Sequence, residues 1–335
     1  MTVKVAINGF GRIGRLVLRA IAESGRTDIS VVGINDLATA EANAHLLKYD
    51  SVHGRFKGDI KVSGDKLIVN GHEILMTQIK NPAELPWGKL GVDVAMECTG
   101  IFTKKDAAMQ HVTAGARKVL ISAPATDEDL TVVYGVNHGK LKASDIVVSN
   151  ASCTTNCLAP VAHILHNAIG IEHGFMTTIH SYTGDQNTVD TMHKDLHRAR
   201  AAAVNIIPTS TGAAKAVGLV LPELKGKLDG TAIRVPTPNV SLVDFKFTTK
   251  RPTTVEEVNK AIIDASNGAL KGILGVYTEP LVSTDFNHDP HSSIFALNET
   301  KVIDGTFVRV MAWYDNEWGF SNRMSDTAVV MAKLG

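Results

Sequence analysis

Three glycines, Gly9, Gly11 and Gly14, constrain the fold of this chain more than any other feature of its sequence. Before them, residues 3–7 are apolar enough for a buried strand, and after them residues 12–24 carry apolar side chains at helical spacing. A Gly-x-Gly-x-x-Gly string is weak evidence alone, because glycines also form ordinary turns. Between a strand and a helix it allows a tight turn, close approach of the backbone to a pyrophosphate and close helix–strand packing. The sequence therefore predicts a dinucleotide site at the amino end of this helix.

Asp36 adds an acidic group at the position that such a site requires. It follows a second predicted strand, residues 29–34, and stands 22 positions after Gly14. A carboxylate there accepts hydrogen bonds from the adenosine ribose hydroxyls and repels the additional phosphate of NADP. The alternative is a loop aspartate that caps the next helix. Strand, glycines and acid together favour NAD as the cofactor.

The first half of the chain alternates strands and helices. After the segments above, strand-like segments cover residues 92–96, 118–121 and 146–148. Helical or irregular segments separate these strands, so we expect a doubly wound parallel sheet with helices on both faces. The sequence therefore predicts an α/β, Rossmann-type domain over residues 1–151.

The second half predicts a different, α+β catalytic domain over residues 152–315. Its strand-like segments partly alternate polar and apolar residues, which is typical of a largely antiparallel sheet. These segments are residues 175–179, 242–248, 293–297 and 307–313. A helix is expected from Thr254, because Thr254 and Glu257 fit a capping box. Helical spacing returns at residues 321–333, and we expect the C-terminal segment 316–335 to dock onto the first domain.

Composition argues against several classes of protein. The chain has 34 basic and 34 acidic residues, whereas a nucleic-acid-binding protein usually needs a basic surplus. No apolar run approaches the roughly 18 residues of a membrane span, and the N-terminus lacks the pattern of a signal peptide. Three cysteines in a long chain do not indicate a disulfide framework. We therefore expect a cytoplasmic protein that binds neither nucleic acid nor membrane.

Cys153 is the candidate nucleophile among the three cysteines. Ser152 is a good N-cap for a helix that begins near Cys153, and a thiol in the first turn of a helix is favoured as thiolate. Cys157 would share its helix face, but a zinc site needs two further ligands and none is evident, so no metal is expected. We interpret Cys98 and Cys157 as packing residues. Pro160 requires either a bend in this helix or a later start of its regular part.

A nucleophilic thiol needs a base within hydrogen-bond reach, and His180 is the best candidate. It ends the apolar segment 175–179 and begins a polar loop. The chain holds 13 histidines, and any of them can instead be a surface or core residue. Spacing alone therefore leaves the choice of base open.

Several segments make the chain recognisable. Residues 151–160, Ala-Ser-Cys-Thr-Thr-Asn-Cys-Leu-Ala-Pro, resemble the active-site segment of the glyceraldehyde-3-phosphate dehydrogenases, and residues 5–15 resemble the start of that family. The family's order continues through residues 180–183, 208–215, 234–238 and 313–317. The resemblance spans residues 3–323, which is nearly the whole chain.

This resemblance implies the phosphorylating oxidation of D-glyceraldehyde 3-phosphate to 1,3-bisphosphoglycerate, a reaction of glycolysis and gluconeogenesis. Cys153 would attack the aldehyde to give a hemithioacetal, and His180 would act as base while hydride passes to NAD. Inorganic phosphate would then attack the resulting thioester. The resemblance also implies a homotetramer.

The resemblance further assigns residues to the phosphate groups and to the cofactor. Thr183 and Arg234 would bind the substrate phosphate, and Arg198 would lie near both phosphates. The attacking phosphate would be bound by Ser152, Thr154, Thr211 and Gly212. The cofactor contacts would be Gly9, Gly11, Arg12, Ile13, Gly14, Asp36, Lys80, Ser122 and Asn316.

The sequence departs from the family pattern at one cofactor contact and in one loop. Lys80 stands where an arginine is expected. Thr191-Met192 replaces a Leu-Pro pair common in NAD-preferring members, in a loop that reaches towards a neighbouring subunit. Neither departure touches the thiol chemistry.

Three other functions share some of these features. An erythrose-4-phosphate dehydrogenase would use the same fold, thiol and base, but would hydrolyse the thioester of a substrate one carbon longer. A thiol hydrolase with a nucleotide-like fold would not use NAD, and the glycines with Asp36 count against it. A non-enzymatic NAD sensor or surface adhesin is disfavoured because Cys153 and His180 are both present. An additional binding role is compatible with catalysis.

Overall fold

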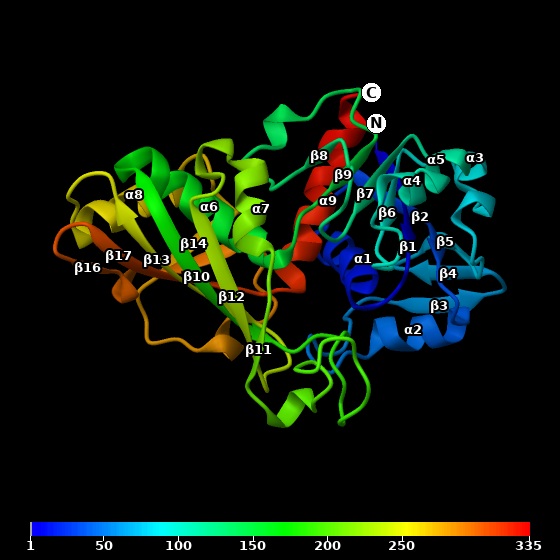
Figure 1. The fold of residues 1–335 in the computed structure, drawn as a ribbon. Coiled ribbons are helices and arrows are strands. Elements are labelled where there is room, and N and C mark those ends of the chain that lie inside the picture. The colour runs from blue at the N-terminus through cyan, green and yellow to red at the C-terminus, as the bar shows by residue number, and fades with distance from the viewer. Residues whose placement is uncertain (1) are drawn as a thin grey trace. The chain divides into compact units, whose positions relative to one another are not determined.

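The computed structural model describes residues 2–335, which form two compact units. Unit 1 comprises the residues up to Ser152 together with residues 321–335, and unit 2 comprises Cys153–Phe320. Each unit is built on a sheet of its own (Figure 1). None of the helices within residues 2–335 is long and apolar enough to cross a membrane.

Unit 1 contains a nine-stranded sheet in the order β3-β4-β5-β2-β1-β6-β7-β9-β8. Its strands are β1 (Val3–Asn8), β2 (Ile29–Asn35), β3 (Ile60–Ser63), β4 (Lys66–Val69), β5 (His72–Thr77), β6 (Val94–Glu97), β7 (Lys118–Ile121), β8 (Leu130–Thr131) and β9 (Val147–Ser149). From β5 to β8 each neighbouring pair is parallel, which confirms the predicted parallel sheet. The antiparallel pairing of β3, β4 and β5 was not predicted, because β3 is half exposed and carries little hydrophobic signal.

Short helices and one long amphipathic helix accompany this sheet. They are α1 (Arg12–Ser24), α2 (Ala40–Lys48), η1 (Pro82–Glu84), α3 (Trp87–Leu90), α4 (Lys105–Ala108), α5 (Gln110–Thr113) and η2 (His138–Lys140). α1 has the bounds expected from its apolar spacing, and it ends at Gly25, whose φ of 63° strongly favours glycine. Trp87 is fully buried and packs with Ala6 of β1 and Ala95 of β6 in one core of this unit.

Unit 2 contains an eight-stranded sheet in the order β11-β12-β10-β13-β17-β15-β14, with β16 paired to β17. Its strands are β10 (Ile171–Ser181), β11 (Ile207–Thr209), β12 (Leu228–Val235), β13 (Ser241–Thr249), β14 (Leu274–Tyr277), β15 (Ser293–Ala296), β16 (Lys301–Ile303) and β17 (Phe307–Tyr314). Only the pairs β10–β12 and β14–β15 are parallel within this sheet, so the prediction of a largely antiparallel sheet is confirmed.

The helices of unit 2 are α6 (Cys153–Ile169), η3 (Ala202–Val204), α7 (Ala213–Val220), η4 (Pro222–Leu224), α8 (Val255–Asn267), η5 (Ser283–Phe286) and η6 (Leu297–Glu299). The last helix, α9 (Trp318–Lys333), begins in unit 2 and belongs to unit 1 from Ser321 onwards. α6 begins at Cys153 and passes through buried Pro160 as one helix. The capping box predicted for α8 forms only in part. Thr254 Oγ1 accepts the N–H of Glu257 (3.2 Å), but the Glu257 carboxylate bonds Arg251 and Thr253 instead.

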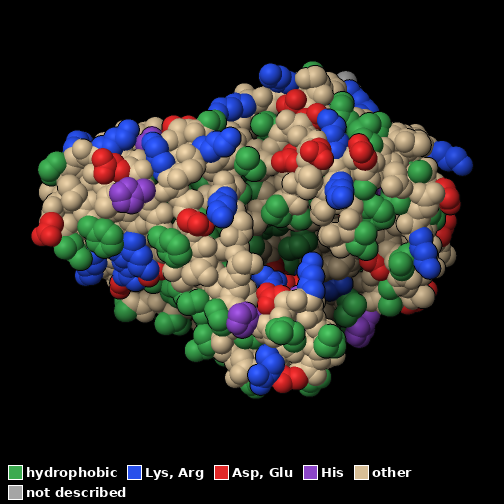
Figure 2. Space-filling view, viewed as in Figure 1, with side chains coloured by type: hydrophobic (Ala, Val, Ile, Leu, Met, Phe, Trp, Pro, Cys, Tyr) green, Lys and Arg blue, Asp and Glu red, His purple; other side chains and the backbone are tan. Residues whose placement is uncertain are grey.

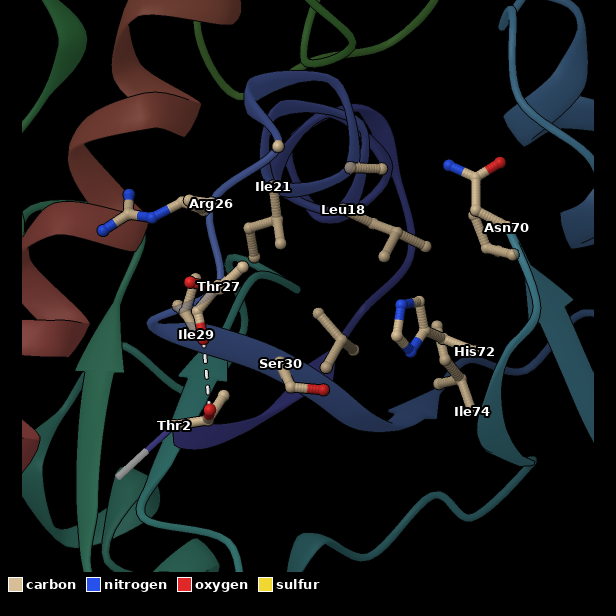
Figure 3. Close-up of a pocket in the computed structure, with 14 residues that line it drawn as sticks. Thr2, Leu18, Ile21, Arg26, Thr27, Ile29, Ser30, Asn70, His72 and Ile74 are labelled. Carbon is tan, nitrogen blue, oxygen red and sulfur yellow. Dashed lines mark hydrogen bonds between the residues drawn. The ribbon is translucent and has the colours of Figure 1, made fainter.

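Unit 1 also contains a cavity of about 390 Å³ at the amino ends of β1 and β2. Figure 3 shows Leu18 and Ile21 of α1 on one side of it and Ser30 and His72 on the other. Arg26 lines the cavity but is already paired with two aspartates. The cavity is lined by none of the residues predicted to act in catalysis or binding. The cavity therefore lies apart from the predicted functional residues.

Candidate active site

The glycine loop of unit 1 connects β1 to α1. Gly9 has a φ of 89°, and a Cβ added at Gly14 would lie only 2.1 Å from the carbonyl oxygen of Gly9. Gly11 is the N-cap residue of α1, makes no side-chain cap bond, and has open space where a Cβ would be. This geometry allows a pyrophosphate to approach the amino end of the helix, so the loop fits a dinucleotide.

Asp36 lies against this glycine loop. Its Oδ2 accepts the N–H of Phe10 (2.8 Å) and its Oδ1 accepts the N–H of Ala38 (2.9 Å). The alternative that Asp36 caps the next helix is wrong, because the Thr39 hydroxyl caps α2 by accepting the N–H of Ala42. The carboxylate is thus held at the carboxyl end of β2, beside β1, where doubly wound sheets bind their ligands.

Three other predicted cofactor residues of unit 1 lie near strand ends or on α1. The Arg12 guanidinium pairs with Asp50. Burial raises the pKa of Asp50, but this pairing and hydrogen bonds from backbone N–H groups outweigh burial and lower the pKa to about 2. Ser122 directly follows β7, and its N–H donates to the carbonyl of Glu97 (2.9 Å). Lys80 is exposed and follows β5.

Cys153 and His180 lie together in unit 2. Cys153 is the first residue of α6, and the preceding turn includes Ala151 in the left-handed region with a φ of 57°. His180 lies near the end of β10, and the distance from its Nε2 to the Sγ of Cys153 is 3.5 Å. His180 therefore lies within the reach of the thiol that a base would need.

The hydrogen bonds of His180 decide which ring nitrogen carries the proton. Nδ1 lies 2.7 Å from the carbonyl oxygen of Ser181. Arg234 Nη1 also lies 3.2 Å from this nitrogen. Because the carbonyl contact is the shorter one and a carbonyl can only accept, we assign the proton to Nδ1, which leaves the lone pair of Nε2 facing the thiol. The edge of the ring also packs on Tyr314, with ring centroids 5.9 Å apart. His180 is therefore oriented as a proton acceptor towards Cys153.

Burial shifts the pKa of both members of this pair. It lowers the pKa of His180 to about 4, and the Arg234 guanidinium contributes in the same direction. Burial also raises the pKa of the Cys153 thiol, although Arg234 and bonds from Thr154 oppose it. Both shifts favour a thiol beside a neutral imidazole. Burial therefore opposes the thiolate that the helix terminus favours.

Four polar side chains of unit 2 lie around Cys153 and His180, namely those of Arg234, Thr183, Asp185 and Arg198. Arg234 stands opposite His180 in the register of β12 and β10, and its Nη1 donates to Ser181 O (3.0 Å) and Thr183 Oγ1 (2.9 Å). The Thr183 hydroxyl donates in turn to Asp185, which pairs with Arg198. Arg198, whose side chain is 19% exposed, is therefore connected to Thr183 through Asp185. The buried Nε of Arg234 has no hydrogen-bond partner, which fits an anion-binding site.

The remaining predicted anion contacts differ in their surroundings. Thr211 Oγ1 accepts the N–H of Ala213 (3.2 Å), and Gly212 is the N-cap of α7 without a side-chain bond. Ser152 belongs to unit 1 and is half buried. The hydroxyl of Thr154 is buried and bonds the Tyr314 hydroxyl (2.8 Å), so a phosphate would meet its backbone more readily than its side chain.

Asn316 is held by two hydroxyls of unit 2. Its Oδ1 accepts from Ser181 Oγ and from Ser241 Oγ, each at 2.9 Å. These bonds fix the direction of the amide plane. The Nδ2 group is therefore presented away from both serines, in an orientation that suits a donor to a carboxamide oxygen.

Two polar residues of this site received no role from the sequence. Tyr314 places its hydroxyl between Thr154 and Thr178, at 2.8 Å from each. Asp185 joins Thr183 to Arg198. Tyr314 stands in the recognisable segment 313–317, and Asp185 stands in the polar loop after His180. The sequence could therefore have indicated them only by their closeness to these motifs.

The other cysteines have the environment of packing residues. Cys157 is fully buried with Sγ 3.5 Å from Ser293 Oγ, and burial raises its pKa to about 12. Burial likewise raises the pKa of Cys98 to about 12. All three cysteines are free thiols. Within residues 2–335, no group of three or more His, Cys, Asp or Glu side chains could hold a metal ion.

The pKa shift of the thiol predicts how Cys153 reacts with a neutral alkylating agent. Thiolate is the reactive form, so iodoacetamide labelling of Cys153 should accelerate as pH rises from 6 to 9. Arg234→Leu removes a charge that lowers this pKa, so the pKa should rise further and labelling at pH 7.5 should slow about tenfold. Mass spectrometry of the Cys153 peptide measures the rate. Arg200→Leu, which removes an exposed arginine paired with Asp190, is the control. Equal labelling rates in all three proteins would contradict the effect of the Arg234 charge on the pKa of Cys153.

Comparison with known proteins gives one family along the chain. Residues 3–105 match the family described as "Glyceraldehyde 3-phosphate dehydrogenase, NAD binding domain", and residues 152–316 match the C-terminal domain of the same family. The glyceraldehyde-3-phosphate dehydrogenase of Xanthobacter flavus is 70% identical, and that of Cereibacter sphaeroides 68%, each over the full length of both chains. The enzyme of Geobacillus stearothermophilus is 57% identical, again over both full lengths. This chain therefore belongs to the glyceraldehyde-3-phosphate dehydrogenase family and is an oxidoreductase that uses NAD.

Proposed function

We propose that this enzyme oxidises D-glyceraldehyde 3-phosphate, with NAD and inorganic phosphate, to 1,3-bisphosphoglycerate. The observation that carries the proposal is the 3.5 Å approach of Cys153 Sγ to His180 Nε2 beside Arg234. This arrangement combines a nucleophile, a base and a cation for an anionic substrate. Family membership supports the same reaction.

The first step is attack of Cys153 on the aldehyde carbon. As the C–S bond forms, the thiol proton passes to Nε2 of His180, which the Nδ1–Ser181 bond keeps available as acceptor. The protonated ring then donates to the developing oxyanion, and the product is a hemithioacetal.

The second step converts the hemithioacetal into a thioester. His180 accepts the hydroxyl proton of the hemithioacetal as its carbon is oxidised. NAD, when bound, supplies the acceptor for the hydride. Asp36 and the glycine loop would hold its adenosine and pyrophosphate, and Asn316 would orient its carboxamide end. Inorganic phosphate then attacks the thioester carbon, the acyl phosphate leaves, and the Cys153 sulfur recovers a proton from His180.

Two anions require separate contacts during this sequence. We assign the substrate phosphate to Thr183 and Arg234, and the attacking phosphate to Ser152, Thr154, Thr211 and Gly212, with Arg198 near both. The unpartnered Nε of Arg234 supports the first assignment, since a phosphate oxygen would satisfy it. The amino end of α7 at Gly212 supports the second, because helix N–H groups bind anions.

Enzyme assembly is the remaining part of the proposal. We propose a homotetramer located in the cytoplasm, in which the exposed face of the unit 2 sheet contacts a second copy. Phe175, Ile303 and Phe307 are 49%, 56% and 41% exposed there, beside Lys246 and Arg309. Figure 2 shows hydrophobic side chains lying among basic ones over this side of unit 2. Apolar surface of this kind is typical of subunit contacts. Sedimentation equilibrium tests this assembly, and we expect four times the chain mass.

The decisive experiment follows NADH absorbance on mixing enzyme, NAD and glyceraldehyde 3-phosphate, with and without inorganic phosphate or arsenate. Sustained turnover only in the presence of the anion is the expected result. Erythrose 4-phosphate serves as the comparison substrate. Turnover that is indifferent to phosphate, or faster on erythrose 4-phosphate, would reject the proposed reaction in favour of hydrolysis of the thioester.

A further inference from the structure

Three neighbouring strands of unit 1 end on polar side chains that bond one another. β1 ends at Asn8, β2 at Asn35 and β6 at Glu97, and the sheet register places Asn8 opposite both of the others. Asn35 Nδ2 donates to Asn8 Oδ1 (2.8 Å), and Asn8 Nδ2 donates to Glu97 Oε2 (2.7 Å). All three are at least 95% buried. A continuous row of side-chain bonds therefore joins the carboxyl ends of the three strands.

His111 of α5 extends this row, and its partner Trp87 determines its tautomer. Trp87 Nε1 lies 3.1 Å from His111 Nδ1, and His111 Nε2 lies 2.9 Å from Glu97 Oε2. An indole N–H can only donate, so Nδ1 accepts and the single ring proton is on Nε2, where it donates to the carboxylate. We name the four residues Asn35, Asn8, Glu97 and His111 the strand-end row.

Glu97 connects the row to the loop that follows β6. Its Oε1 accepts the N–H of Thr99 (2.7 Å) and the Thr99 hydroxyl. Thr99 in turn lies against the glycine loop, since a Cβ added at Gly9 would be 2.7 Å from Thr99 N. Four neutral donors from Asn8, His111 and Thr99 thus hold one buried carboxylate, which compensates for the loss of its hydration.

The other end of the row reaches the segment that carries Asp36. Asn35 Oδ1 accepts the N–H of Ile79 (2.9 Å) and the Thr77 hydroxyl (2.8 Å), and the carbonyl of Asn35 accepts the N–H of Gly9 (2.8 Å). Asp36 is the next residue and accepts the N–H of Phe10. The row therefore ties together the Asp36 segment, the glycine loop and the Thr99 loop.

We infer that Glu97 and His111 are positioning residues for NAD, acting through the strand-end row. They hold the three loops at the carboxyl edge of the sheet at fixed spacing before the cofactor binds. An apolar core would stabilise the sheet as well as a buried carboxylate does, so the satisfied polar row is better explained by the precision that it gives to the loops above it. Preorganised loops lose less conformational entropy on binding, which raises affinity.

Two substitutions break the row with different changes of shape. Glu97→Gln keeps the side-chain volume but replaces one carboxylate oxygen by an NH2 group. Whichever oxygen is replaced, the NH2 group faces groups that already donate: Asn8 and His111 at one oxygen position, or Thr99 at the other. His111→Leu removes one donor to the carboxylate. His111→Gln is the conservative variant, since its amide N–H can replace the Nε2–H. Glu73→Gln, an exposed carboxylate on β5 of the same sheet, is the matched control.

The experiment titrates NAD into each purified full-length protein by calorimetry, without substrate. We expect Glu97→Gln and His111→Leu to weaken NAD binding about tenfold or more. We expect His111→Gln to stay within about threefold of the unchanged protein, and Glu73→Gln to match it. In turnover assays the KM for NAD should rise in the first two variants, while kcat at saturating NAD changes by less than about threefold and the KM for the aldehyde is constant.

Two results would overturn the inference. One is unchanged NAD affinity in both Glu97→Gln and His111→Leu; the other is a fall in kcat without any rise in the KM for NAD. If either variant fails to fold, as judged by near-UV circular dichroism, Thr99→Val replaces it, and we expect at least about threefold weaker binding from the loss of one hydroxyl. The inference rests on NAD binding by this unit. Failure of the unchanged protein to bind NAD would reject that assignment separately.

Discussion

Replacement of Cys153 by serine is expected to abolish phosphate-dependent NADH formation, with turnover falling by roughly 10⁴-fold or more. The serine hydroxyl is far less acidic than the thiol and a much weaker nucleophile at neutral pH. No covalent adduct with the aldehyde should therefore form. Steady-state absorbance measures the loss, and mass spectrometry of the enzyme quenched with substrate measures the missing thioester.

Cys157→Ser is the matched control for this substitution. Cys157 lies one turn further along α6, where its thiol contacts Ser293 and is fully buried. We expect this variant to retain activity within about threefold, since the serine hydroxyl can keep that contact. Phosphate-dependent NADH formation by Cys153→Ser, or its loss in Cys157→Ser with an intact fold, would contradict the assignment of the nucleophile.

Replacement of His180 by glutamine should lower kcat by about 10²- to 10⁴-fold, the range for loss of a general base. Glutamine can keep a bond to the Ser181 carbonyl but cannot accept a proton, so the binding of NAD and of substrate should change little. The pH profile provides a second measurement. With the pKa of His180 at about 4, the base is neutral above that pH, and the unchanged enzyme should show no loss of activity from this group between pH 8 and pH 6.

The direction of the pKa shift allows a sharper test with Arg234. Burial and the Arg234 charge both lower the pKa of His180, so Arg234→Gln should raise it. The acid limb of the kcat profile should then move to higher pH in Arg234→Gln and disappear in His180→Gln. His163→Gln, a histidine on α6 that contacts Asn167, is the control. An acid limb unchanged by both substitutions would show that another group titrates.

Local sequence pattern determined the elements whose signal is strong and continuous. α1 has the predicted bounds because its apolar side chains recur at the helical period and Gly25 takes up a left-handed conformation at its end. β7 was predicted from the strand-like pattern of residues 118–121, and all four residues of Lys118–Ile121 are buried in the structure. The same pattern did not predict β3 or β12, because both are half exposed and β12 includes Gly230. Weakly buried strands depend on their neighbours for pairing, which a local pattern does not contain.

The sequence by itself determined the glycine loop, Asp36 and the candidate nucleophile, because each follows from residue types at short spacing. Only the tertiary structure decided what depends on distance and dielectric. It brought His180 to 3.5 Å from Cys153 by placing β10 beside the start of α6, and it buried the Cys153 thiol, which raises its pKa. It also joined Asn8, Asn35 and Glu97, which are far apart along the chain, through the register of three strands. Contacts and desolvation arise only when distant segments pack, so no local pattern could have specified them.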